Sequence, residues 1–118
     1  MSCNHAPKRQ QMIDFIVATA ALDIELLRSL VTTEFIWSVP GRFDIYGPQI
    51  LIQELSNHYN QVASLNIHSS ITHGCLGSMH GIEILKTGKE IHFAHFFEFE
   101  NHKKDAKLSK VTSYIVVG

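Results

Sequence analysis

Cysteine, net charge and long hydrophobic runs are all scarce in this 118-residue chain. Two cysteines, Cys3 and Cys75, are far fewer than a small secreted disulfide scaffold uses, so we expect both to be free thiols. Ten basic residues against 11 acidic ones leave a net charge of −1, which gives no electrostatic basis for binding nucleic acid or an anionic membrane. We therefore expect neither of these as a partner.

The apolar residues are plentiful but never continuous. No run approaches the roughly 18 apolar residues that cross a bilayer, and Asp14 and Asp23 interrupt the only N-terminal stretch that resembles a signal peptide. A hydrophobic content of 45% with 18% charged residues is nevertheless that of an ordinary globular protein, which excludes disorder as the main description. The sequence predicts a soluble, cytoplasmic protein in which residues 1–118 form a single domain.

Helical patterns occupy the first half of the chain. Apolar residues recur at helical spacing over 8–21 and again over 24–31, where Asp23 offers an N-cap oxygen to the second helix. Gly47-Pro48 opens a third helix, because proline is preset for the first helical position. The expected buried stripe of this third helix is Leu51, Leu55, Tyr59 and Val62.

Strand patterns follow. Residues 32–39 and 43–46 form two strands on either side of the Pro40-Gly41 turn, and four consecutive antiparallel strands are expected over 65–73, 75–85, 90–100 and 108–117. Gly74, Gly77 and Gly81 fit no strand-to-helix phosphate motif, so we interpret them as room for sheet curvature. Helices first and an antiparallel meander second predict an α+β fold.

Five short strings are spread over nearly the whole chain: Leu22-Asp23-Ile24-Glu25-Leu26-Leu27, Trp37-Ser38-Val39-Pro40-Gly41, Gly47 before a helix, Phe93-x-His95-Phe96-Phe97-x-Phe99 and Val111-Thr112-Ser113-Tyr114-Ile115. In their order and spacing they resemble the nuclear-transport-factor-2-like superfamily, especially its SnoaL-like polyketide cyclase branch. The resemblance implies a cone-shaped half-barrel, with N-terminal helices packed on a curved, mostly antiparallel sheet. It further implies an apolar ligand pocket on the concave face and a homodimer through the convex face.

The strand over 90–100 alternates clearly between two faces. Its first face carries Ile91, Phe93, His95, Phe97 and Phe99, which we expect to form the cavity wall. The other face is mixed and suits a dimer interface or water; it carries His92, Ala94, Phe96 and Glu98.

Relatives that work as ketosteroid isomerases place a tyrosine on the first helix, a catalytic aspartate before the proline of the first turn and a protonated aspartate in a late strand. The matching positions in this chain carry Phe15, Val39 and His95. Because Phe15 has no hydroxyl and Val39 has no proton to transfer, the sequence disfavours ketosteroid isomerisation.

His95 remains the most promising functional residue. Between Phe93 and Phe97, its charged form is penalised by desolvation, so the imidazole could act as an acid or base, assisted by Tyr46 or His73. The alternative is a core histidine that is merely hydrogen bonded. Tyr46 could equally be a tyrosine at the rim of the cavity. The expected ligand-binding residues are Phe15, Trp37, Val39, Phe93 and Phe97, although Trp37 suits core packing at least as well.

Eight histidines raise the question of a metal site. His73, His80, His92 and His95 are the obvious group, but residues three apart on a strand point to opposite faces, so His92 and His95 cannot share an ion. We expect no metal and no cofactor.

Two function classes remain open. The first is a domain that binds a small apolar molecule without turnover. The second is a cofactor-independent isomerase, cyclase or dehydratase in which His95 acts as acid or base on a ring-bearing apolar substrate. The missing carboxylates favour the first class, because proton abstraction beside a carbonyl needs a positioned base and an oxyanion donor.

Overall fold

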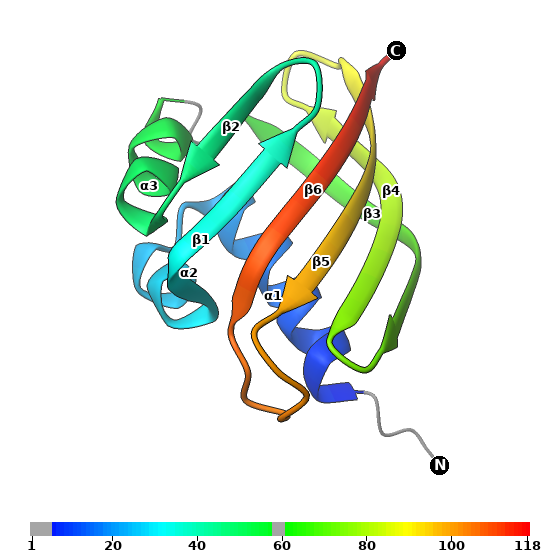
Figure 1. Cartoon of the computed structure of the whole chain (residues 1–118). Helices are drawn as coiled ribbons and strands as arrows, with labels where there is room; N and C mark the ends of the chain where they lie inside the picture. The colour runs from blue at the N-terminus through cyan, green and yellow to red at the C-terminus, as the bar shows by residue number, and fades with distance from the viewer. Residues whose placement is uncertain (1–5, 58–60) are drawn as a thin grey trace.

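A computed structural model describes residues 6–57 and 61–118 (Figure 1). Two of the residues discussed above, Cys3 and Tyr59, lie outside the described part. The first half of the chain contains α1 (Ala6–Ala21), α2 (Ile24–Leu30), β1 (Val31–Val39), β2 (Phe43–Tyr46) and α3 (Pro48–Ser56). The second half contains β3 (Val62–His73), β4 (Leu76–Leu85), β5 (Glu90–Phe99) and β6 (Leu108–Val117).

The six strands form one sheet in the order β2-β1-β6-β5-β4-β3. All neighbouring pairs are antiparallel except β1 and β6, which run parallel with Trp37 opposite Val111. The predicted α+β fold with a curved, mostly antiparallel sheet is thereby confirmed. The expected four-strand meander is β3 to β6.

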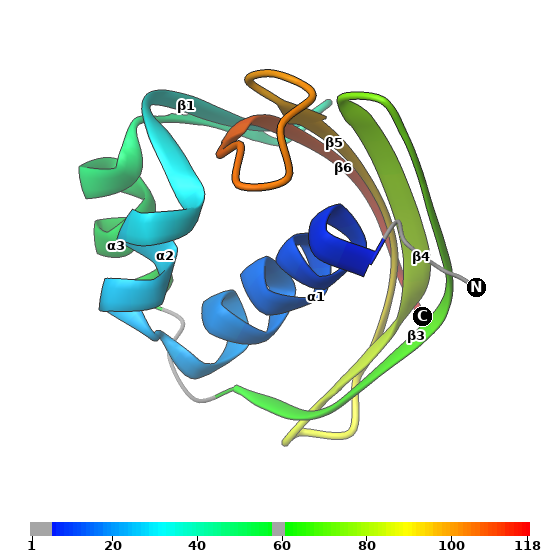
Figure 2. The same cartoon turned by 90° about the horizontal axis from the view of Figure 1, so that it is seen from below.

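Helix α1 lies inside the bend of the sheet, and α2 and α3 lie beside it (Figure 2). The side chains of Met12, Phe15 and Ile16 on α1 are buried. The ring centroid of Phe15 lies 5.7 Å from that of Phe35 and 6.3 Å from that of Phe97. The core of the protein therefore sits between the helices and the concave face of the sheet, and α2 and α3 add Leu27, Leu30 and Leu51 to it.

Local sequence signals explain where the helices begin. The Asp23 carboxylate accepts a hydrogen bond from the backbone N–H of Leu26 at 3.3 Å, which confirms Asp23 as the N-cap of α2. Gly47 precedes Pro48 with a φ of 85°, a left-handed conformation that favours glycine. Both helix starts are thus dictated locally.

The third helix is shorter than its predicted stripe. Leu51 is buried and Leu55 is half-buried, as expected, but α3 ends at Ser56. Val62 is therefore the first residue of β3 and not part of a helical stripe, which corrects the prediction. The spacing of Val62 from Leu55 fits a helical register, but its β-branched side chain suits the extended chain equally well.

At Gly81, β4 lies very close to the backbone of β3. A Cβ atom built on Gly81 would lie 2.1 Å from the backbone oxygen of Asn66, beside a register shift in the β3–β4 pairing between Ile67 and Ser69. Only glycine tolerates this approach, which supports the expectation that glycine provides room for sheet curvature.

Within residues 6–57 and 61–118, no helix combines the length and the apolar character needed to span a lipid bilayer.

Candidate functional site

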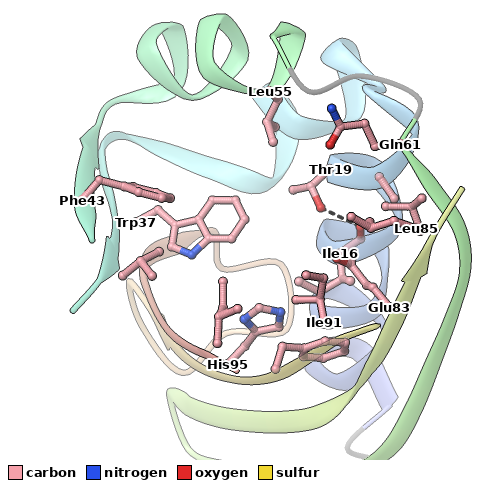
Figure 3. A pocket seen from close by; sticks show the side chains of 15 residues that line it. Ile16, Thr19, Trp37, Phe43, Leu55, Gln61, Glu83, Leu85, Ile91 and His95 are labelled. Atoms are coloured by element: carbon pink, nitrogen blue, oxygen red, sulfur yellow. Dashed lines mark hydrogen bonds between the residues drawn. The ribbon is translucent and has the colours of Figure 1, made fainter. Parts of the chain in front are cut away.

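A cavity of about 220 Å³ remains on the concave side of the sheet, between α1, α3 and the strands (Figure 3). Its wall is mostly apolar and includes Ile16, Trp37, Val39, Phe93 and Ile115. Four side chains add polar groups to this wall: Thr19, Gln61, Glu83 and His95. The Thr19 hydroxyl is already occupied, because it donates to the backbone oxygen of Ile16 at 2.7 Å.

A chain of three side chains holds His95 in place. The indole N–H of Trp37 donates to the Ser113 hydroxyl oxygen at 2.7 Å, and the same oxygen lies 2.6 Å from Nδ1 of His95. Trp37 comes from β1, His95 from β5 and Ser113 from β6, where Ser113 pairs directly with His95. Three strands of the sheet therefore fix the orientation of one imidazole ring.

Aromatic rings enclose the imidazole. The Phe93 ring stacks on His95 with centroids 4.5 Å apart, and the rings of Phe97 and Trp37 approach it edge-on at 6.0 and 6.3 Å. This burial lowers the pKa of His95 from 6.5 to about 4, because the imidazolium loses its hydration. At neutral pH His95 is therefore uncharged, and it offers one N–H donor and one acceptor nitrogen.

The structure adds a carboxyl group that the sequence analysis missed. Glu83 lies on β4 opposite Ile91 and lines the same cavity as His95. Burial raises the pKa of the Glu83 carboxyl above its ordinary value. The strand alternation that buries Met79 and Gly81 places Glu83 on the inner face as well.

The predicted site residues fall into three groups. Trp37, Val39, Phe93 and His95 line the cavity. Phe15 and Phe97 are completely buried in the core beside it and are not among its lining residues. The third group, Tyr46 and His73, lies outside this cavity.

Neither of the two assistants expected for His95 joins it. Tyr46 is 61% exposed, and its hydroxyl lies 3.3 Å from Asp44, because the strand alternation that buries Ile45 turns Tyr46 outward. His73 ends β3 at a separate hollow, shared with Lys8 and other residues. The strand register, which was not visible in the sequence, keeps both away from His95.

The face assignment of the β5 histidines agrees with the structure. His95 points inward and is 6% exposed, whereas His92 is exposed and lies 3.3 Å from Glu90. His80 lies on the outer side of β4, where its ring meets that of His68 at 5.6 Å. Across the described ranges, no three histidine, cysteine, aspartate or glutamate side chains come together as metal ligands.

Chemically, the cavity combines an apolar wall with a neutral imidazole and a partly desolvated carboxyl group. The imidazole can donate or accept a single hydrogen bond. The carboxyl is the stronger base, because burial raises its pKa while it lowers that of His95 to about 4. The arrangement suits recognition of an uncharged molecule and leaves Glu83 as the candidate proton acceptor.

No protein-family model and no curated protein sequence matches this chain. Solved structures do match it over most of its length. An NTF2-like protein of unknown function from Burkholderia xenovorans is 20% identical, with 94% of this chain and 84% of that chain covered and a TM-score of 0.78. A Shewanella denitrificans protein, provisionally assigned as a SnoaL-like polyketide cyclase, is 17% identical, with 94% and 91% covered and a TM-score of 0.79.

A third match has a named activity. An LEH-like epoxide hydrolase of M. tuberculosis is 14% identical, with 91% of this chain and 76% of that chain covered and a TM-score of 0.74. At these identities, the matches establish the architecture and leave the activity open. Together with the helix order and the bent sheet, they show that this chain has the same α+β cone fold as these NTF2-like and SnoaL-like structures.

Proposed function

We propose that the protein binds a small, largely apolar molecule in the cavity beside His95, without turning it over. The observation that carries this proposal is the cavity itself: about 220 Å³ stays open next to a core whose neighbouring side chains, such as Phe15 and Phe97, are completely buried. Its volume lies just below the roughly 300–1,000 Å³ of pockets for drug-sized ligands, which favours a ligand of one or two rings.

The electrostatics of His95 argue against catalysis by this residue. A pKa of about 4 makes the imidazole a weak base, and its Nδ1 is already engaged with Ser113. General acid–base catalysis works best when the pKa lies near the working pH. Tyr46 and His73, which were expected to assist, do not reach the cavity.

A second candidate function rests on Glu83. This carboxyl group lines the cavity and has a raised pKa, as a general base often has. A cofactor-independent isomerase, cyclase or dehydratase could use Glu83 to remove a proton from a ring-bearing substrate. One structural neighbour, from Kribbella flavida, carries a provisional ketosteroid isomerase name, which is consistent with this alternative.

A ligand screen tests the first proposal. Steroid-like and polyketide-like compounds and simple bicyclic aromatics would be added to the purified protein, and thermal shifts would be followed by native mass spectrometry. A ligand at about 100 times its Kd stabilises the folded state by about 2.7 kcal/mol. A bound compound recovered unchanged supports binding without turnover, a converted compound supports the enzyme, and no stabilisation by any compound overturns both.

We also propose that the outer face of the sheet forms a homodimer. Large apolar side chains are exposed on this face, and the rings of Phe96 and Tyr114 meet at 5.9 Å. Such a contiguous exposed patch commonly marks an interface. Light scattering should give a dimer mass for the wild-type protein and for Val17→Lys, a control on an exposed position of α1, but a monomer mass for Phe96→Lys. A wild-type monomer would refute the proposal.

A further inference from the structure

Ser113 determines which ring nitrogen of His95 carries the proton. An indole N–H can only donate, so Ser113 accepts the hydrogen bond from Trp37. Ser113 is completely buried, and within the described residues its hydroxyl hydrogen has no hydrogen-bond acceptor other than Nδ1 of His95. The hydroxyl therefore donates to Nδ1, and the proton of the neutral imidazole resides on Nε2.

The N–H at Nε2 of His95 is directed at the cavity. This atom has no hydrogen-bond partner within residues 6–57 and 61–118. In the same part of the chain, the only fully buried polar side-chain atom without a partner is Oε1 of Gln11, so Nε2 keeps accessible surface. Since His95 lines the cavity, that surface belongs to the cavity, and the wall there presents a hydrogen-bond donor.

Glu83 presents an acceptor at a separate point of the same wall. Its carboxyl group has neither a hydrogen bond nor an ion pair within the described part of the protein. An unpaired acceptor that is partly removed from water is stabilised by any hydrogen-bond donor that reaches it. A carboxyl oxygen accepts a hydrogen bond in both protonation states, so Glu83 favours a hydroxyl group on the ligand.

The sheet register fixes the spacing of these two groups. Glu83 pairs with Ile91, and His95 lies four residues further along β5, which places its Cα atom about 14 Å from that of Ile91 at about 3.4 Å per residue. The side chains of His95, Ile91 and Glu83 all face the same cavity (Figure 3). A ligand that meets both polar groups must therefore be elongated, with its polar atoms at opposite ends.

We infer that the cavity selects an uncharged, elongated molecule that offers a hydrogen-bond acceptor to His95 at one end and a hydroxyl donor to Glu83 at the other. This inference rests on the proposed function, because it requires that the cavity be a ligand site. It adds the chemical pattern of the ligand and assigns Ser113 as the residue that positions the imidazole proton.

Four probes built on one naphthalene frame test the inference: acetylnaphthol with its two groups at opposite ends of the frame, acetylnaphthalene, naphthol and naphthalene. Acetylnaphthol carries both the acetyl acceptor and the hydroxyl donor. Acetylnaphthalene carries only the acetyl group, naphthol carries only the hydroxyl group, and naphthalene carries neither. Affinities would be measured by calorimetry and fluorescence with the whole protein. Each satisfied hydrogen bond should tighten binding about fivefold, so acetylnaphthol should bind most tightly and naphthalene least.

Matched variants assign each advantage to a residue. His95→Phe should abolish the gain in affinity that the acetyl group gives and keep the gain that the hydroxyl group gives. Glu83→Leu should abolish the gain from the hydroxyl group and keep the gain from the acetyl group. His92→Phe and Glu98→Gln, on the exposed outer face of β5, should keep both advantages. If His95→Phe fails to fold, His95→Gln retains a side-chain N–H donor and should keep part of the acetyl preference.

The possible results separate the two proposals. Equal affinities for all four probes overturn the inference and leave the proposed function standing. The same conclusion follows if each variant reduces the affinity gains from the acetyl and hydroxyl groups equally. No binding of any probe overturns the proposed function and the inference with it. Nitrogen NMR shifts of the His95 ring give a ligand-free test: a proton on Nε2 supports the inference, and a proton on Nδ1 overturns it.

Discussion

The buried imidazole of His95 predicts a specific loss of stability in acid. In the folded protein the pKa of His95 is lowered to about 4, whereas in the unfolded chain it returns to 6.5. Between these values the unfolded chain binds a proton that the folded protein does not bind, so stability falls as the pH decreases through this window. At 1.36 kcal/mol for each pKa unit, the loss attributable to His95 is about 3 kcal/mol when complete.

His95→Phe isolates this contribution. The substitution keeps an aromatic ring beside Phe93 and removes the titrating group, while the loss of the Ser113 hydrogen bond adds an offset that does not vary with pH. Glu83, whose raised pKa acts in the opposite direction and lowers stability as the pH rises above about 4.5, is common to both proteins and cancels in the comparison.

Urea unfolding at a series of pH values from about 7 to about 4.5 is the assay. The free energy of unfolding of the wild-type protein should fall by about 2 to 3 kcal/mol more than that of His95→Phe over this range. His92→Phe, which removes an exposed histidine from the other face of β5, should follow the wild type. Equal losses in wild type and His95→Phe would show that the imidazole titrates normally and would refute the buried, neutral His95.

Three further predictions concern the same region. Ser113→Ala should lower the free energy of unfolding by about 2 kcal/mol, because it leaves the Trp37 N–H without its acceptor; an unchanged urea midpoint would contradict the hydrogen-bonded chain. Gly81→Ala should cost about 3 kcal/mol or prevent folding, since the new Cβ would meet the Asn66 backbone oxygen; circular dichroism melting checks this, and a wild-type melting temperature would disprove the close approach. Ala20→Leu, on the cavity side of α1, should weaken naphthol binding at least about tenfold by calorimetry while leaving the melting temperature within a few degrees, and undiminished binding would place the ligand elsewhere.

The sequence by itself determined the elements of this protein, because the signals for them are local. The Asp23 cap and Gly47-Pro48 start two helices where they were predicted, and the period-two pattern of β5 assigned His95 to the inner face and His92 to the outer one. The end of α3 is the counterexample: the helical register that placed Val62 in its stripe did not mark where the helix stops.

Only the tertiary structure decided which side chains meet. The pairing of β5 with β6 brings Ser113 against His95, and the pairing of β4 with β5 brings Glu83 to the cavity, whereas Tyr46 and His73 remain outside it. Contacts between distant segments depend on strand order and register, which local periodicity does not encode. For that reason the sequence predicted His95 as a candidate site residue, whereas only the fold revealed its hydrogen-bond partner Ser113 and the Glu83 carboxyl group in the same cavity.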